Sequence, residues 1–126
     1  MEITIDTNGI LPIYQQIVCQ ISNAIINGKL LAGHNLPSIR QLAYDLTLNH
    51  NTVAKAYKQL ENQRIILTAG RKGTFIHNQA IQHIKQNNQR EAEFLLAELM
   101  QSFKQSGISS AEVVKLLEKQ LNNFRD

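Results

Sequence analysis

Cysteines and long apolar runs are almost absent from this chain of 126 residues. The single cysteine, Cys19, excludes an internal disulfide framework and gives no sign of secretion. No apolar run approaches the ~18 residues that a membrane-spanning helix needs, and the first residues lack the pattern of a signal peptide. We therefore expect a soluble, cytoplasmic protein that does not contact a membrane.

Patterns that would indicate catalysis or metal binding are also missing from the sequence. The four histidines are scattered, and no spacing of His and Cys resembles a zinc site. The segment Gly70–Thr74 is glycine-rich and basic but lacks the spacing of a phosphate-binding P-loop. A lone thiol in a helix is more often a packing residue than a reactive one, so we expect Cys19 to be buried. The sequence predicts no enzyme, no cofactor and no metal site.

The net charge of +3 is small, but it is unevenly distributed along the chain. Residues 28–76 hold seven basic and two acidic residues, a balance of +5, whereas residues 77–126 hold six of each sign. A basic part joined to a neutral part is typical of a polyanion-binding module that carries an appendage. A randomly uneven surface would give the same counts, so charge alone does not decide between these interpretations.

The first part of the chain shows the periodicity of short helices after an initial arm. Ile3 and Ile5 alternate with polar neighbours, as in a short strand or an ordered arm. The first helix is expected to begin around Pro12 and to end at Asn27-Gly28. Its apolar stripe has helical spacing and consists of Ile13, Ile17, Ile21, Ala24 and Ile25.

Two further helices separated by a short turn predict a helix-turn-helix. Ser38 and Gln41 have the spacing of a capping box that begins the second helix. Asn49 is suited to cap the third helix after a break at residues 47–49. The expected buried faces are Ile39, Leu42, Ala43 and Leu46 in the second helix, and Val53, Ala56, Tyr57 and Leu60 in the third.

A β-hairpin with a basic tip is expected after the third helix. Residues 65–68 and 74–76 are β-prone, and Gly70–Gly73 between them forms a turn that contains Arg71 and Lys72. Three helices followed by such a hairpin describe a winged helix-turn-helix. The predicted fold class is mainly α with a small β-hairpin, and residues 1–77 form the expected DNA-binding domain.

The remaining residues, 78–126, predict two amphipathic helices. The first runs to Ser106-Gly107, and the second is capped by Ser109 and Glu112. Two such helices cannot enclose a core between them, so they either fold back on the winged module or pair with a second chain. We favour a dimerisation region, whose candidate contacts are Leu95, Leu96, Leu99, Met100, Phe103, Val113, Leu116, Leu117 and Leu121.

The polar face of the third helix has side chains suited to reading double-stranded DNA. Residues near the start of a recognition helix reach base edges in the major groove. Asn51 can pair with adenine, Thr52 can contact several bases, and Lys55 can reach guanine or phosphate. Arg40 and Ser38 at the start of the second helix are placed for phosphate contacts, and Arg71 and Lys72 for the minor groove. The alternative to DNA contact is that these residues lie on an ordinary solvent-exposed helix face and in a turn that only increases solubility, because both use the same residue types.

Four segments closely resemble the GntR family of bacterial transcription regulators. They are PIYQQI at 12–17, GHNLPSIRQLA at 33–43, NTVAKAYKQLE at 51–61 and GRKGTFI at 70–76. The resemblance covers roughly residues 10–77. The segment SGISSAE at 106–112, before a leucine-rich helix, is similar to the YtrA subfamily, whose short C-terminal region serves chiefly for dimerisation.

The resemblance implies a homodimeric repressor that binds a palindromic operator, often that of its own operon and of adjacent transporter genes. Two positions depart from the family: many relatives have Arg in place of His50, and several have Arg in place of Ala54. These departures put the family's base preferences in doubt, and His50 makes DNA binding mildly sensitive to pH. The positions that correspond to DNA contacts in the family are Ser38, Arg40, Asn49, His50, Asn51, Thr52, Lys55, Arg71, Lys72 and Gly73.

The resemblance leaves little room for an effector domain. The larger GntR subfamilies have one of well over a hundred residues, whereas about fifty follow the winged module here. A small-molecule effector, if the protein has one, is expected at the dimer interface or between the winged module and the tail. The alternative function is a winged-helix protein-interaction module without a specific operator.

Overall fold

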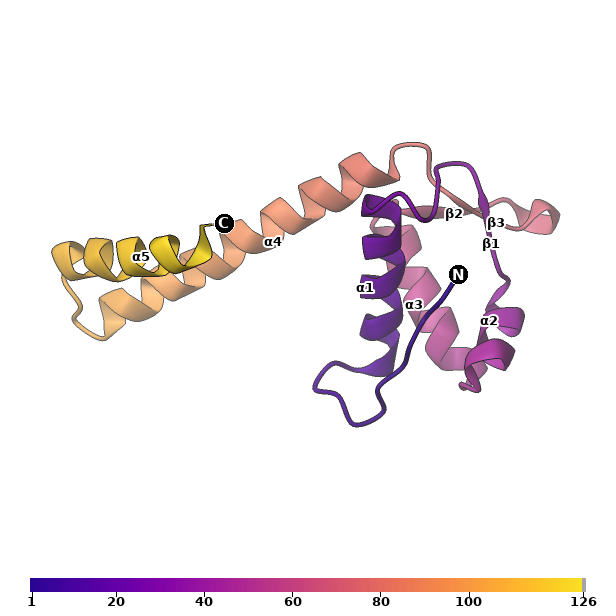
Figure 1. The fold of residues 1–126 in the computed structure, drawn as a ribbon, viewed down its shortest axis with the longest axis horizontal. Coiled ribbons are helices and arrows are strands. Elements are labelled where there is room, and N and C mark those ends of the chain that lie inside the picture. Colours follow the sequence, from indigo (N-terminus) through magenta and orange to yellow (C-terminus); the bar gives the residue numbers. More distant parts are fainter. Residues whose placement is uncertain (126) are drawn as a thin grey trace. The chain divides into compact units, whose positions relative to one another are not determined.

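A computed structural model describes residues 1–125 and contains five α-helices, one short 3-10 helix and three short strands (Figure 1). The chain forms two compact units, of which the N-terminal unit is Met1–Asn87 and the C-terminal unit begins at Asn88. The elements are α1 (Ile13–Ile26), β1 (Asn35–Leu36), α2 (Ile39–Leu46), α3 (His50–Asn62), β2 (Ile66–Thr68), η1 (Gly70–Lys72), β3 (Thr74–Ile76), α4 (Ala80–Gln105) and α5 (Ser110–Phe124).

The helix boundaries follow the signals in the sequence. Pro12 precedes α1, and Gly28 in the left-handed conformation follows it, as expected. Ser38 caps α2 by accepting a hydrogen bond from the Gln41 amide at 3.1 Å. The expected capping box is only half formed, because the Gln41 side chain donates to the Asp45 carboxylate instead.

A three-stranded antiparallel sheet completes the N-terminal unit, in the order β1-β3-β2. The expected hairpin is confirmed, since β2 pairs with β3 and η1 forms its tip. The strand β1 adds a third member that the sequence did not predict, with Asn35 opposite Phe75 and Leu36 opposite Thr74. A strand of two residues is too short for an alternating pattern, and its pairing depends on a partner about 40 residues away.

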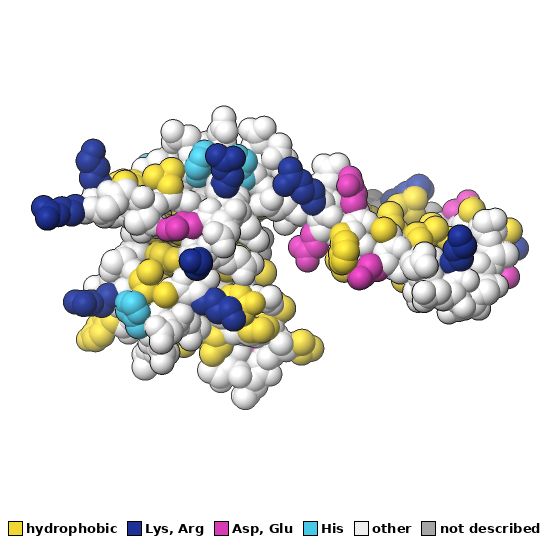
Figure 2. All heavy atoms as spheres, turned by 180° about the vertical axis from the view of Figure 1, so that it is seen from behind, with side chains coloured by type: hydrophobic (Ala, Val, Ile, Leu, Met, Phe, Trp, Pro, Cys, Tyr) yellow, Lys and Arg dark blue, Asp and Glu magenta, His cyan; other side chains and the backbone are white. Residues whose placement is uncertain are grey.

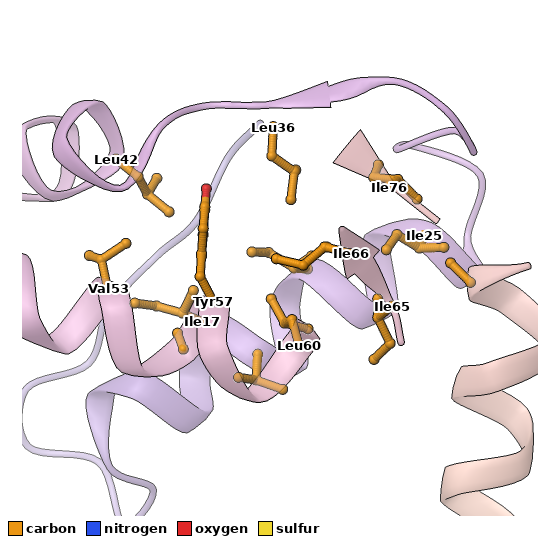
Figure 3. Close-up of a cluster of buried hydrophobic side chains, with 14 of the residues drawn as sticks. Ile17, Ile25, Leu36, Leu42, Val53, Tyr57, Leu60, Ile65, Ile66 and Ile76 are labelled. Atoms are coloured by element: carbon orange, nitrogen blue, oxygen red, sulfur yellow. The ribbon is translucent and has the colours of Figure 1, made fainter. Parts of the chain in front are cut away.

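The core of the N-terminal unit lies between α1, α3 and the sheet (Figure 3). All four residues expected on the inner face of α3 are buried, and Tyr57 is 3% exposed. Ile17, Ile21 and Ile25 of α1 are almost completely buried, as the helical stripe predicted. The helix-turn-helix and the wing therefore share one hydrophobic core, which fixes the wing relative to α3.

The first residues form an ordered arm along α1 and are not assigned as a strand. The side-chain amide of Gln20 accepts from the Thr4 backbone N–H at 2.9 Å and donates to the Thr4 carbonyl at 2.7 Å. One turn earlier, the Gln16 side chain makes the same pair of bonds with Asp6 and a third to the Leu11 carbonyl. These two side chains give the arm the hydrogen bonds that a neighbouring strand would give.

The start of α4 packs into the N-terminal unit. Ala80 and Ile84 are buried, and they point into the same core as α3. The His83 ring lies 2.7 Å from the Arg64 carbonyl, and Asn87 donates to the Gln63 carbonyl at 3.3 Å. Side chains of α4 therefore satisfy carbonyl groups at the C-terminal end of α3, which a helix leaves without internal partners.

The C-terminal unit consists of the rest of α4 and α5, which folds back beside α4 in Figure 1. Ser109 caps α5 by accepting from the Glu112 amide, and the Ser109 hydroxyl also contacts the Glu112 carboxylate. Val113 is buried here, at 6% exposure. Most other apolar side chains of this unit remain exposed.

Cys19 corrects one expectation from the sequence, because it is exposed. It lies on the outer side of α1, away from the stripe of Ile17 and Ile21, and does not contribute to the core. Among the described residues, no helix is both long and apolar enough to cross a membrane. Residues 1–125 also contain no group of three or more His, Cys, Asp or Glu side chains able to hold a metal ion.

Candidate nucleic-acid interface

The N-terminal end of α3 presents its polar side chains to solvent. His50, Asn51 and Lys55 are exposed, and Thr52 is half-buried. The Asn49 side chain is the cap, because its Oδ1 accepts from the Asn51 backbone N–H at 2.7 Å. Asn49 therefore starts the helix through its Oδ1, and the exposed side chains of the next residues can contact a ligand.

Basic side chains are spread over one face of the N-terminal unit, where acidic side chains are sparse (Figure 2). The uneven charge of the sequence thus corresponds to a surface feature of the folded unit. A face of this kind attracts a polyanion and concentrates it near the exposed end of α3.

Lys55 has a partner within the chain. Its ammonium group lies over the Tyr14 ring of α1, 4.1 Å from the ring centroid. A cation over an aromatic face is attracted by the ring's quadrupole. Tyr14 therefore restricts the directions in which the Lys55 side chain can extend from α3.

A part-buried hydrogen bond links α3 to the chain just before α2. The Tyr57 hydroxyl donates to the Pro37 carbonyl at 2.7 Å, and Figure 3 shows the ring standing in the core beside Leu42. Burial raises the pKa of the Tyr57 phenol, so the group stays protonated and remains a donor. The bond holds Pro37, the residue just before the Ser38 cap, against α3.

The start of α2 carries Arg40 on an exposed face, close to the Ser38 cap. Tyr44 lies one turn later on the same side and is 81% exposed. Tyr44 was not among the residues predicted to contact DNA, although its place outside the apolar stripe of the helix is visible in the sequence. The helix-turn-helix thus presents a cation and an aromatic ring beside α3.

The tip of the wing is a tight turn built on two glycines. Gly70 and Gly73 both have positive φ, and the Ala69 N–H donates to the Gly73 carbonyl at 2.8 Å. Arg71 and Lys72 are exposed between these glycines, and Gly73 itself is half-buried. The turn therefore projects two cations from the body of the unit.

A groove of about 380 Å³ lies between the start of α2, the outer side of α3 and the wing. Ser38, Lys58 and Gly73 contribute to its walls, together with Ala54. The Thr68 hydroxyl donates to the Glu61 carboxylate and so links α3 to β2 at the groove. Lys58 is an exposed cation on α3 that was not among the residues predicted to contact DNA.

The apolar side chains expected at a dimer interface mostly lie exposed on the C-terminal unit. The exposed fraction is 55% for Leu95, 50% for Leu96, 45% for Leu99, 39% for Met100, 44% for Leu116, 37% for Leu117 and 48% for Leu121. Phe103 is half-buried, and Val113 is the buried exception. Phe94 and Phe124 add further exposed apolar area, at 61% and 81%. Most of the apolar side chains expected at a dimer interface are therefore accessible to solvent in a single copy of the chain.

Residues 13–76 match the family described as bacterial regulatory proteins, gntR family. Two relatives from Bacillus subtilis (strain 168) are similar to the chain. The HTH-type transcriptional repressor YtrA is 44% identical over 78 residues, which are 62% of this chain and 60% of the repressor. The uncharacterized HTH-type transcriptional regulator YhcF is 32% identical over 106 residues, which are 82% of this chain and 85% of that regulator. The match to YtrA thus spans about three fifths of that repressor's length.

Two solved structures share the fold over nearly the whole chain, and a third shares it over 60% of the chain. A transcriptional antiterminator from Listeria monocytogenes EGD-e is 37% identical with a TM-score of 0.70, covering 95% of this chain and 90% of its own. The GntR-family transcription factor YtrA from Sulfolobus acidocaldarius is 28% identical with a TM-score of 0.58, covering 96% and 97%. The AraR DNA-binding domain in complex with operator ORE1 is 26% identical with a TM-score of 0.51, covering 60% and 93%. The winged-helix fold class predicted from the sequence is confirmed.

Proposed function

Since the chain belongs to the gntR family of bacterial regulatory proteins, we propose that it is a sequence-specific, DNA-binding transcriptional repressor. This family consists of regulators rather than enzymes, in agreement with the absence of a catalytic pattern in the sequence. The observation that carries the proposal is the exposed, polar N-terminal end of α3, in the same unit as a wing whose tip exposes two cations. The operator complex of the structurally similar AraR domain supports DNA as the partner.

In this proposal the start of α3 enters the major groove and the wing approaches the minor groove. Asn51 and Thr52 read base edges, whereas Arg71 and Lys72 neutralise phosphates. Affinity comes mainly from the phosphate contacts, and specificity from α3. The proposed DNA-binding residues are Ser38, Arg40, Asn49, His50, Asn51, Thr52, Lys55, Arg71, Lys72 and Gly73.

The proposed assembly is a homodimer in which two copies of the C-terminal unit bury their exposed leucines. In functional terms, residues 1–77 bind DNA and residues 78–126 dimerise. A two-fold dimer places two α3 helices about one turn of DNA apart, so the expected operator is a palindrome. We propose that this operator belongs to the regulator's own operon and to adjacent transporter-type genes, with the protein in the cytoplasm.

The test is a gel shift with the DNA upstream of the protein's own gene and an excess of nonspecific competitor. Asn51→Ala is expected to weaken binding to the cognate site by about 1–3 kcal/mol and to relax one base position, because one base-edge contact is lost. Lys72→Ala is expected to weaken binding to all sequences and to reduce the salt dependence, because a phosphate contact is lost.

The control is Lys119→Ala, which removes one exposed cation from α5 of the C-terminal unit and is expected to leave both quantities unchanged. If Asn51→Ala and Lys72→Ala merely scaled the affinity for every sequence alike, the role assigned to α3 would be wrong. Failure of the wild-type chain to shift the upstream DNA above competitor would favour the protein-interaction module.

A further inference from the structure

The shared hydrophobic core fixes the base of the wing, which consists of β2, η1 and β3, but it does not extend to the tip. Ile65, Ile66 and Ile76 at this base are buried, and Figure 3 shows them in the core. Further out, Leu67 is 40% exposed, and Thr68, the last residue of β2, is exposed as well. The apolar packing that holds the base therefore ends before the turn that contains the two cations.

The hydrogen bonds of the tip give it a shape but do not set its direction. The Ala69 N–H donates to the Gly73 carbonyl, and the Lys72 N–H donates to the Ala69 carbonyl. The Gly73 N–H donates to the Gly70 carbonyl. These bonds join residues of the tip to one another and do not connect it to the helices. The strand that leads into the tip, β2, lies at the edge of the sheet, so β3 alone supports it through backbone pairing.

A side-chain contact joins the wing to α3 just before the tip begins. The Thr68 hydroxyl donates a hydrogen bond to the carboxylate of Glu61, in the last turn of α3. A carboxylate is a stronger acceptor than a neutral oxygen. The chain between the two residues reverses direction within seven positions, with Arg64 at a positive φ of 61°. The bond therefore closes a short loop and holds the outer end of β2 to the helix.

The effect of the Glu61–Thr68 bond is local. Both partners are exposed, so the bond contributes little to the stability of the unit as a whole. It acts, however, at a point where the core has ended and where the tip has only its own hydrogen bonds. Conformational freedom that is removed before binding does not have to be removed when a partner binds. A wing whose direction is fixed in advance therefore binds more tightly than a mobile wing with the same cations.

We propose that Glu61 and Thr68 are positioning residues for DNA binding. They hold the wing so that Arg71 and Lys72 reach phosphates while the start of α3 lies in the major groove. This inference rests on the proposed function and adds to it two residues that act through the wing cations. Glu61 is one of only two acidic residues within residues 28–76, and its charge by itself weakens the attraction of DNA. The bond to Thr68 gives this carboxylate a function on a basic part of the chain.

The positioning is tested first without DNA, by nitrogen-15 relaxation of the full chain. Thr68→Val keeps the branched shape of the side chain and removes the hydroxyl. We expect the order parameters of the Arg71 and Lys72 amides to fall toward about 0.6, a value typical of flexible backbone. Thr68→Ser retains the hydroxyl and should keep the wild-type values. The matched control Thr74→Val makes the same change directly opposite in β3 and leaves the Glu61–Thr68 bond in place.

The second measurement uses the DNA upstream of the protein's own gene. Thr68→Val is expected to lower the affinity about threefold to fivefold, because the tip must then be ordered on binding. The salt dependence should stay as in the wild type, because the number of phosphates contacted is unchanged. In the background Arg71→Ala/Lys72→Ala, Thr68→Val should cause no further loss, since a wing without cations gains nothing from its direction.

Several results would overturn the proposal. The tip could stay ordered in Thr68→Val, or the affinity could stay unchanged although the tip becomes mobile. Thr68→Ser could behave like Thr68→Val, the salt dependence could fall as for a lost phosphate contact, or the loss could persist without the two wing cations. A failed gel shift of the wild-type chain would reject the proposed function, whereas an unchanged order of the tip would reject only the role of the Glu61–Thr68 bond.

Discussion

The Tyr57 hydroxyl is a single polar atom that connects α3 to the chain just before α2. Tyr57→Phe removes the hydrogen bond to the Pro37 carbonyl and keeps the packing of the ring. We expect the free energy of unfolding to fall by about 1 kcal/mol, because the part-buried Pro37 carbonyl loses its hydrogen-bond partner. Urea denaturation measures the change. Tyr44→Phe, on the 81% exposed ring of α2, is the control and should leave stability unchanged.

Lys55 is a second residue whose orientation depends on a single contact. The interaction energy between its ammonium group and the Tyr14 ring is about 0.5–1 kcal/mol, as for other exposed cation–π pairs. We expect Tyr14→Leu to lower DNA affinity about twofold to fivefold, because Lys55 loses its preferred direction. Tyr14→Phe keeps the aromatic face and should preserve affinity.

A binding titration in the Lys55→Ala background distinguishes this effect from a loss of packing at Tyr14. If Tyr14 acts through Lys55, Tyr14→Leu should have little further effect once Lys55 is absent. An equal loss in both backgrounds would show that Tyr14 acts independently of Lys55.

Among the elements, the arm is the one whose attachment depends most on side chains. Gln16 is buried and makes three hydrogen bonds to the arm's backbone. Gln16→Met keeps the length of the side chain and removes these bonds. We expect the arm to detach, with a loss of about 1–3 kcal/mol in unfolding free energy and of exchange protection at the Asp6 amide.

Hydrogen exchange measured by NMR reports this change directly. Gln15→Met is the matched control, because the Gln15 amide bonds only to the Tyr14 hydroxyl, at 3.3 Å, and not to the arm. Unaltered protection at Asp6 in the Gln16 variant would show that apolar packing of Ile3 and Ile5 is enough to hold the arm.

The elements also show how far the sequence could predict this fold. The α3 cap at Asn49 and the buried stripe through Val53 and Leu60 were predictable, because both depend on neighbours within a few residues. The strand β1 and the burial of Gln16 were not, because their partners lie about 40 and 10 residues away. The exposure of Cys19 was available from the helical wheel, since it falls outside the apolar stripe of α1.

The candidate DNA-binding site was predictable for a similar reason. Its side chains sit at the start of α3 and at the tip of the wing, positions that local signals define. The groove beside Lys58 and the contact of Lys55 with Tyr14 were not predictable, because they arise from the packing of separate elements.

At the scale of the whole molecule, the proposed homodimer depends on the exposed leucines of the C-terminal unit, which form its proposed interface. Leu99 of α4 is 45% exposed. Leu99→Glu places a charge on the proposed interface, so we expect the dimer to dissociate by tenfold or more in Kd, because a buried unpaired charge is costly. Analytical ultracentrifugation measures the dissociation.

The matched control for this prediction is Gln101→Glu, which adds the same charge at an exposed position of α4 that was polar before. This variant should remain dimeric. In DNA binding, Leu99→Glu should reduce affinity for a full palindrome more than for a single half-site. An unchanged mass in solution would place the dimer interface elsewhere.

The contacts of His83 and Asn87 with the carbonyls of Arg64 and Gln63, directly after α3, bear on where this protein can be divided. A fragment cut at residue 77 would lack both side chains, and it would also lose Ala80 and Ile84 from the core. A chimera that joins the N-terminal unit to a foreign oligomerisation domain should therefore be joined after Asn87. Residues 1–87 are likewise the shortest fragment suitable for crystallising the N-terminal unit with its proposed DNA partner.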